Sequence, residues 1–155
     1  MIIGIDPGIT GAIVALYDDG EIAAVFDMPV VKKPNGRREV DAANLAQKIE
    51  AMAALAPELV TAVVEQVGAM PRQGVASVFS FGDSFGVIRG VLGALGIPVR
   101  RVTPNKWKKA AGLVGQDKDR ARTLAIEKWP KQAARFERKK DVGRADAALI
   151  AFFGG

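Results

Sequence analysis

The chain has 155 residues, of which 49% are apolar and 25% charged, and its formal net charge is +5. Because it contains no Cys and no His, thiol nucleophiles, His-based catalytic triads and the usual zinc sites are excluded. Any chemistry must therefore depend on carboxylates, lysines and a hard cation. The length favours a single domain over residues 1–155. No stretch approaches the roughly 20 apolar residues that span a bilayer, and no signal peptide is visible, so we expect a cytoplasmic protein without a membrane partner.

The charges are divided unevenly along the chain. Residues 1–100 contain 8 Lys and Arg against 11 Asp and Glu, whereas residues 101–155 contain 14 against 6. The two parts therefore carry −3 and +8, which sum to the net +5. This asymmetry indicates either a polyanionic partner for the basic part or a basic surface that only water covers.

The apolar run over residues 1–5 predicts a buried strand that ends at Asp6, where Pro7 and Gly8 turn the backbone. An ionised carboxylate at the end of a buried strand requires compensation by a cation or by hydrogen-bond donors. Two interpretations follow. Asp6 binds a charged ligand, of which a metal ion is the simplest, or its side chain caps the turn.

Residues 9–17 and 21–28 have strand composition, so they complete a three-stranded antiparallel meander with the first strand. Two Pro, one Gly and several basic residues indicate an exposed loop over residues 29–40. Asp41 is then a credible N-cap for a helix that continues to about Leu55.

A second informative strand spans residues 61–67, where Glu65 interrupts a β-branched run that is otherwise typical of a strand buried on both faces. A polar loop follows, and then a helix over residues 75–95. The remaining elements are a strand over residues 98–102 and three helices, near residues 103–109, 117–129 and 143–153. This order predicts an α/β domain whose mixed sheet is layered with helices.

Asp146 lies on the last of these helices, among alanines that indicate close packing on the sheet. The sequence thus allows three shielded carboxylates, Asp6, Glu65 and Asp146, to converge. Such a cluster suits Mg²⁺, with Mn²⁺ as a substitute, because these ions prefer oxygen ligands. Two ions about 4 Å apart would suit phosphodiester hydrolysis. Basic residues near the cluster would contact the phosphates, and the candidates are Lys106, Lys109 and Lys118. The alternative for each lysine is a surface charge that only water contacts.

Three segments carry a family resemblance: Gly4-Ile5-Asp6-Pro7-Gly8, Val64-Glu65-Gln66-Val67, and the run 145–151 around Asp146. In this order and spacing they resemble the motifs of RuvC-type Holliday-junction resolvases of the RNase H-like superfamily, with phage or prophage members the most similar. The resemblance covers nearly the whole chain.

The resemblance implies an RNase H-like fold with a five-stranded mixed sheet flanked by helices. It further implies a homodimer that nicks opposing strands of a four-way DNA junction with Mg²⁺, in a bacterial or phage-infected cell. The three carboxylates match the family's acidic motifs, and Lys118 resembles its lysine before the last two helices.

The chain departs from the family pattern at two positions. Gly143 stands where the family commonly has another Asp, and the nearest acid, Asp141, is our candidate for the fourth metal ligand. Gly68 replaces the family's aromatic wedge, which leaves the following loop as the candidate for contacting the DNA crossover. The residues that we assign to DNA contact in this loop are Met70, Arg72 and Gln73.

The helix over residues 75–95 carries two distinct faces. At about 100° per residue, one face holds an apolar stripe and the other an arc of glycines. The stripe consists of Phe81, Phe85, Ile88 and Leu92, and the arc consists of Gly82, Gly86, Gly90 and Gly93. We expect the stripe to pack on the sheet. The glycines then approach either another helix of the same domain or the same helix of a second subunit.

Three other functions compete with junction resolution. The N-terminal motif also resembles the phosphate-binding turn of actin-like kinases and ATPases, but these need two related subdomains, which exceed this length. A second competitor is another RNase H-like nuclease that acts on branched or hybrid substrates. A third is a catalytically inactive module that binds junctions.

Overall fold

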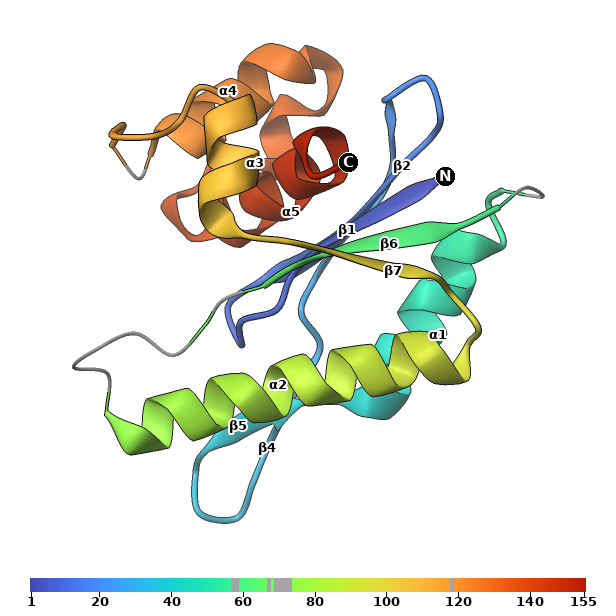
Figure 1. Ribbon diagram of the computed structural model, residues 1–155, viewed down its shortest axis with the longest axis vertical. Coiled ribbons are helices and arrows are strands. Elements are labelled where there is room, and N and C mark those ends of the chain that lie inside the picture. Colours follow the sequence, from blue (N-terminus) through green and yellow to red (C-terminus); the bar gives the residue numbers. More distant parts are fainter. Residues whose placement is uncertain (57–58, 67, 69–73, 118) are drawn as a thin grey trace.

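The computed structural model describes residues 1–56, 59–66, 68, 74–117 and 119–155. At its centre lies a five-stranded mixed sheet with the order β3-β2-β1-β6-β7 (Figure 1). The strands are β1 (Ile2–Asp6), β2 (Ala12–Leu16), β3 (Ile22–Asp27), β6 (Thr61–Glu65) and β7 (Val99–Val102). The first three form the predicted antiparallel meander, and β6 and β7 run parallel to β1. The predicted mixed sheet flanked by helices is confirmed.

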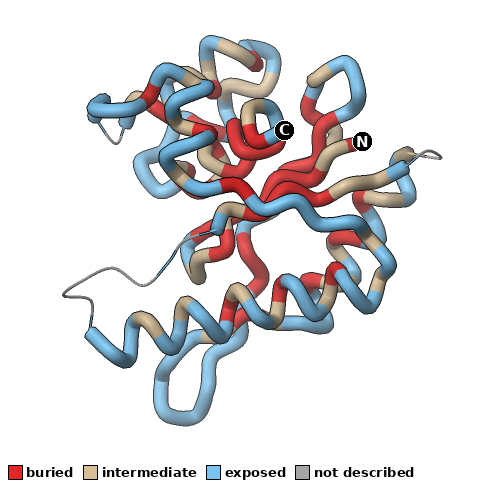
Figure 2. The backbone as a smooth tube through the Cα atoms, viewed as in Figure 1, coloured by how far each residue is buried: buried red, intermediate tan, exposed pale blue. Residues whose placement is uncertain are grey.

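Helices cover both faces of this sheet. The three helices of the C-terminal part, α3 (Pro104–Ala110), α4 (Arg120–Lys128) and α5 (Val142–Phe153), cover one face, and α1 (Ala42–Ala53) and α2 (Val75–Ala94) cover the other (Figure 1). Each face has its own apolar core. The buried residues are concentrated along the central strands and on the sides of the helices that meet them (Figure 2).

Alternation along β1 decides which layer each of its side chains meets. Ile3 and Ile5 are fully buried in the core beneath α1 and α2. Since successive side chains of a strand point to opposite faces, Gly4 and Asp6 face the layer that contains α5. The strand thus buries its apolar side chains on one side and turns its carboxylate to the other.

Gly4 allows α5 to lie directly on β1. A Cβ atom at this position would overlap the carbonyl oxygen of Ala147 and would lie 2.5 Å from the backbone nitrogen of Ala151. No residue other than glycine fits this contact without a shift of the helix or the strand. The distance between α5 and the sheet is therefore set by the absence of a side chain.

The segment between β3 and α1 corrects our prediction of an exposed loop over residues 29–40. It forms a two-stranded antiparallel hairpin, β4 (Val30–Lys32) and β5 (Arg38–Val40), outside the central sheet. A tight turn closes the hairpin, with Gly36 at a φ of 79°. Of the residues that suggested a loop, Pro34 and Gly36 lie within this turn and Pro29 immediately precedes β4. Asp41 then caps α1 as predicted, because its side chain accepts a hydrogen bond of 3.0 Å from the amide of Asn44.

Several element boundaries differ from the predicted ones. α1 ends at Ala53 rather than near Leu55, and α4 begins at Arg120, three residues after the expected start. Two 3-10 helices that we did not predict connect α4 to α5. They are η1 (Pro130–Arg135) and η2 (Lys139–Asp141).

α2 is twenty residues long and mostly apolar, yet only part of it is buried. Its length and composition alone would also suit a membrane-spanning helix, contrary to our expectation for any stretch of this chain, and 17% of its most apolar window is buried. Ile88 and Leu92 pack fully into the core as predicted, while Phe81 and Phe85 are half-buried.

We expect Gly4→Ala to destabilise the protein by about 1–3 kcal/mol, the usual range for overpacking in a core. Gly74→Ala is the matched control, because Gly74 lies before α2 with an ordinary φ of −63° and a Cβ there meets nothing within 4 Å. It should change the free energy of unfolding by less than about 1 kcal/mol, since glycine and alanine differ only modestly as N-cap residues. Urea denaturation of both variants measures the difference. Equal stabilities would contradict the proposed close contact.

Candidate active site

Asp6 and Glu65 lie side by side at one edge of the sheet. β1 and β6 are parallel neighbours whose register pairs Ile5 with Val64, so the next residues of the two strands are adjacent. Neighbouring strands are about 4.8 Å apart. Val63, two residues before Glu65, lies in the core beneath α5, and alternation therefore turns Glu65 to the same face as Asp6.

Asp146 reaches this edge from α5. The next residue, Ala147, lies against Gly4, so the helix holds Asp146 close to the end of β1. Its carboxylate is half-buried, and Oδ1 is a buried oxygen that accepts no hydrogen bond from the part of the chain that the structure describes. A buried acceptor of this kind usually has a partner, so an unpaired one marks a site where a ligand would be stabilising.

The environment makes Asp6 and Asp146 difficult to ionise. Burial raises the pKa of Asp6 to about 7, and the nearby carboxylates of Asp146 and Glu65 contribute in the same direction. Burial likewise raises the pKa of Asp146 to about 6, against the opposing influence of Lys108 and with a further contribution from Glu65. Pairs of raised pKa values in a cluster of acids are typical of functional sites.

Two neighbouring residues of α3 act on the acidic cluster, and the sequence analysis assigned neither of them. Trp107 is fully buried, and its indole nitrogen donates a hydrogen bond of 2.7 Å to Oε1 of Glu65. Lys108 supplies the positive charge that favours ionisation of both Asp6 and Asp146 by lowering their pKa values. The sequence signal that could have identified these two residues is Trp107 itself, because burial of its side chain fixes the side of the helix on which each neighbouring residue lies.

A cavity of about 450 Å³ opens beside these residues. Asp146 and Lys108 form part of its wall, together with Asn105 of α3 and Gln116 of the connection between α3 and α4. The acidic cluster is therefore accessible from the layer of basic helices rather than closed within the core.

Asp141, our candidate for a fourth metal ligand, lies in η2 immediately before α5 and is 1% exposed. Its carboxylate accepts hydrogen bonds from the backbone and the guanidinium of Arg138 and lies 3.7 Å from Arg144. Burial opposes its charge, but the bonds from Arg138 outweigh this and keep the pKa of Asp141 below its ordinary value. In this arrangement its oxygens are bound to arginine, and its role as a metal ligand stays a prediction.

Gly143 occupies a position where a side chain has no room. A Cβ there would lie 2.5 Å from the carbonyl oxygen of Thr10, because the first turn of α5 rests on the turn after β1. The departure from the family pattern at this position therefore follows from packing, since an acid here would push α5 away from the sheet.

The remaining residues that we assigned to DNA contact are only partly placed. Lys106 and Lys109 are exposed on α3. The other four candidates lie outside the described residues, so their assignments stay predictions; they are Met70, Arg72, Gln73 and Lys118.

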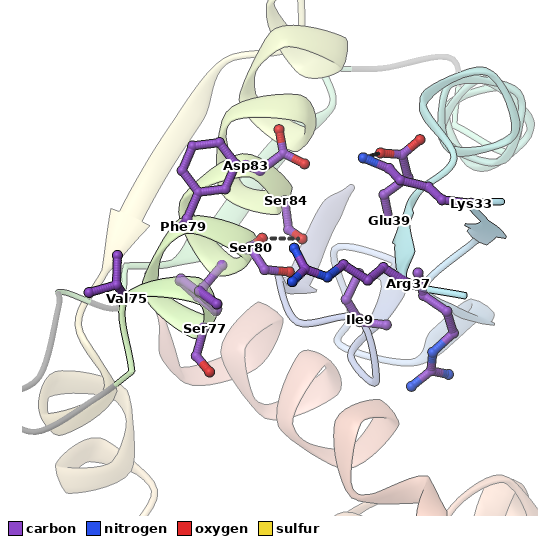
Figure 3. Close-up of a pocket in the computed structure, with 13 residues that line it drawn as sticks. Ile9, Lys33, Arg37, Glu39, Val75, Ser77, Phe79, Ser80, Asp83 and Ser84 are labelled. Carbon is purple, nitrogen blue, oxygen red and sulfur yellow. Dashed lines mark hydrogen bonds and ion pairs between the residues drawn. The ribbon is translucent and has the colours of Figure 1, made fainter. Parts of the chain in front are cut away.

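A larger hollow, of about 910 Å³, lies between the β4–β5 hairpin and the N-terminal half of α2 (Figure 3). Arg37 projects into it from the hairpin, and Ser80 and Ser84 face it from the helix. Lys33 on the hairpin is paired with Glu39. The hollow contains none of the three clustered acids, although Ile9, three residues after Asp6, forms part of its wall.

The donor set at the acidic cluster fits a hard divalent cation. Three carboxylates supply oxygen ligands, and Oδ1 of Asp146 has no hydrogen-bond partner among the described residues. Within the described ranges, three acidic side chains do not come close enough together to hold one ion. A shared ion would therefore require at least one of these side chains to rotate.

Known proteins are similar to this chain in sequence or in fold. No family model matches the chain. The chloroplast Holliday junction resolvase MOC1 of Chlamydomonas reinhardtii is 32% identical over 117 residues, which are 75% of this chain but 13% of that protein. The chain thus spans about an eighth of the length of the curated relative that it matches.

Solved structures are similar over nearly the whole chain. RuvC of Thermus thermophilus matches with a TM-score of 0.62 and 21% identity, covering 98% of this chain and 91% of that one. The same protein in complex with a Holliday junction substrate matches with a TM-score of 0.61 and 20% identity over 98% and 90% of the two chains. The yeast mitochondrial Holliday junction resolvase Ydc2 matches with a TM-score of 0.52 and 15% identity over 97% and 75%. The chain therefore has the RuvC-type, RNase H-like fold.

The raised pKa values predict how stability depends on pH. The folded protein binds protons on Asp6 and Asp146 at pH values where the unfolded chain, with an ordinary pKa of 3.8, does not. Stability in EDTA should therefore fall as pH rises from about 4 to about 7. Asp6→Asn removes one such group, so the stabilising effect of this substitution should grow by about 3 kcal/mol between about pH 5 and about pH 8, because about two pH units below the folded pKa of about 7 each contribute about 1.4 kcal/mol.

Urea unfolding of the wild type and Asp6→Asn at both pH values measures this difference. Titrating groups distant from Asp6 are shared by the two proteins and cancel in the comparison, whereas the repulsion of Asp6 by Asp146 and Glu65 is part of the difference. A constant difference between the two proteins across this range would show that Asp6 ionises normally.

Proposed function

We propose that this protein is a metal-dependent endonuclease that resolves four-way DNA junctions by paired hydrolysis of phosphodiester bonds. The observation that carries the proposal is the placement of Asp6 and Glu65 at the ends of adjacent parallel strands, with Asp146 held over them by α5. The similarity to Holliday junction resolvases in sequence and in fold supports the same function.

The three carboxylates would hold Mg²⁺, or Mn²⁺ in its place, with two ions per active site and Asp141 as a candidate fourth ligand. Ions of this kind, when bound, polarise the phosphodiester and lower the pKa of the attacking water. The chain's own contribution is to hold the carboxylates at one edge of the sheet. Lys108, whose charge already acts on two of them, is placed to offset negative charge on a phosphate.

Basic side chains on two sides of the acidic cluster support DNA as the substrate. Lys106 and Lys109 are exposed on α3, and Arg37 and Arg38 are exposed on the β4–β5 hairpin. Contacts of lysine and arginine with phosphates supply most of the affinity for DNA and do not depend on base sequence. Branched DNA could therefore contact the protein on both sides of the cleavage site.

The acidic cluster predicts the phenotype of three isosteric variants. We expect Asp6→Asn, Glu65→Gln and Asp146→Asn each to lower the cleavage rate of a four-way junction by at least about a hundredfold, because loss of a metal ligand removes most of the charge stabilisation. Junction binding should remain, since the phosphates are held by basic residues. Cleavage assays in Mg²⁺, in Mn²⁺ and in excess EDTA, with gel-shift assays of binding, measure these effects.

The substrate panel should contain four-way junctions, linear duplex and RNA–DNA hybrid. Preferential cleavage of the hybrid would indicate another RNase H-like nuclease, and binding without cleavage would indicate an inactive module. Full activity in EDTA would overturn the proposed chemistry.

The exposed face of α2 supports a homodimer. A Cβ at any of its four glycines would meet nothing within 4 Å, so these glycines do not pack against another described helix of the chain. At about 100° per residue, Val75 and Phe79 fall on the same arc as the glycines. They are 87% and 77% exposed. An apolar arc of this kind on a soluble protein marks an interaction site, and the same helix of a second subunit across a two-fold axis is the partner we propose.

A bulky residue on this arc should separate the subunits. We expect Gly86→Leu and Gly90→Leu to give folded monomers that nick single strands but lose paired cleavage, which needs two active sites at a fixed spacing. Ala51→Leu, at an exposed position on α1, is the control and should remain dimeric. Light scattering measures the oligomeric state, and a supercoiled cruciform plasmid distinguishes paired cuts from single nicks. Dimeric Gly86→Leu and Gly90→Leu proteins would place the interface elsewhere.

We also propose a cellular origin for this protein from its sequence motifs. Their similarity to phage or prophage members would place the protein in the cytoplasm of a bacterial or phage-infected cell. Fractionation of cells that produce it, with detection by antibody, tests this location.

A further inference from the structure

Trp107 lies where the chain leaves β7 and enters α3. The register of β6 and β7 pairs Glu65 with Val102, and the amide of Gln66 donates a 2.8 Å hydrogen bond to the carbonyl of Val102. The first turn of α3 therefore begins beside Glu65. Trp107 reaches back from this turn to the end of β6.

The indole ring is held rigidly at this position. Trp107 is 0% exposed and belongs to the core that contains Val63, Val102 and the alanines of α5. A buried ring of this size has little freedom to rotate in a close-packed core. Its N–H group consequently points in one direction, toward Oε1 of Glu65 at 2.7 Å.

The hydrogen bond engages one of the two oxygens of Glu65 and leaves the second available. Glu65 is half-buried at the open end of β6, and its side chain has three rotatable bonds with which to turn toward solvent. The indole restricts this rotation. A donor that orients a metal-binding side chain in this way commonly changes metal affinity or activity by about 10-fold to 100-fold when removed.

We propose that Trp107 is a positioning residue, whose indole N–H holds the Glu65 carboxylate in the orientation from which it binds a divalent cation together with Asp6 and Asp146. This inference rests on the proposed metal site and assigns a specific role to a residue of α3. The adjacent Lys108 lies with its ammonium 5.3 Å from the centre of the Trp107 ring, so the same ring also supports the lysine that faces the acids.

The competing interpretation is that Trp107 only fills the core, and a second tryptophan allows the two to be separated. Trp129 is 2% exposed, and its indole nitrogen donates a 2.9 Å hydrogen bond to the carbonyl of Gly20. It therefore matches Trp107 in burial and in the number of indole hydrogen bonds, but its acceptor is a backbone oxygen outside the acidic cluster.

The test compares Trp107→Phe with Trp129→Phe. Each substitution keeps an aromatic ring and removes one indole N–H, so both should lower thermal stability. We expect only Trp107→Phe to weaken Mn²⁺ binding, by about tenfold or more, as measured by electron paramagnetic resonance of the free ion. The Mg²⁺ concentration for half-maximal cleavage should rise with it. Equal Mn²⁺ affinity of wild type and Trp107→Phe would overturn the proposal.

A measurement on intact side chains covers the case in which Trp107→Phe does not fold. The chain has two tryptophans and so gives two indole N–H signals in a ¹H–¹⁵N spectrum, which Trp129→Phe assigns. Addition of Mg²⁺, and separately Glu65→Gln, should shift the Trp107 signal and leave the Trp129 signal in place. An unmoved Trp107 signal in both cases would overturn the proposal.

Failure of this inference can be distinguished from failure of the proposed function. Metal binding and the indole signal are measured without DNA, so they report on Trp107 even if the protein cleaves no junction. A protein that binds Mn²⁺ and cleaves junctions equally well with Trp107→Phe refutes the positioning role alone. A wild type that binds no Mn²⁺ refutes both.

Discussion

The contact between α5 and β1 determines the rest of the site. Because Gly4 has no side chain, the backbone of α5 lies on the strand at Ala147 and Ala151, and Asp146 is brought to the edge where Asp6 ends β1. A second glycine, Gly143, allows the first turn of the helix to rest on the turn after β1. A helix raised by one methyl group at either point would carry Asp146 away from the other two acids. The catalytic geometry that we propose thus depends on two glycines that have no side chain to take part in the reaction.

This geometry opposes stability. Carboxylates that burial and mutual repulsion make hard to ionise raise the free energy of the folded state near neutral pH, as the raised pKa values of Asp6 and Asp146 indicate. The structure offsets only part of this repulsion, through the backbone N–H of Gly8 at Asp6, the charge of Lys108 and the hydrogen bond from Trp107 to Glu65. Clusters with uncompensated charge usually persist because function requires them. A bound cation is the partner whose charge would complete the compensation.

The two layers of helices divide the remaining tasks. The layer of α3, α4 and α5 carries Asp146, Trp107 and Lys108, so it completes the acidic cluster. The opposite layer buries the apolar stripe of α2 against the sheet and leaves an arc of glycines with Val75 and Phe79 exposed. Chemistry and proposed self-association therefore lie on opposite sides of one sheet. This separation would let two subunits join through α2 without covering either acidic cluster.

By itself, the sequence determined the features that depend on local patterns: the strand that ends in Asp6, the strand that carries Glu65, the cap at Asp41, and the Ala-rich helix that carries Asp146. Periodicity and turn chemistry act between residues close in the chain, which is why these predictions succeeded. The β4–β5 hairpin was missed because its turn residues also occur in irregular loops. Only the tertiary structure decided that Trp107 meets Glu65, that Lys108 rather than its neighbours faces the acids, and that Asp141 pairs with Arg138. These contacts depend on strand order and register, which pair residues that are far apart in the chain. No local sequence pattern indicates such a pairing.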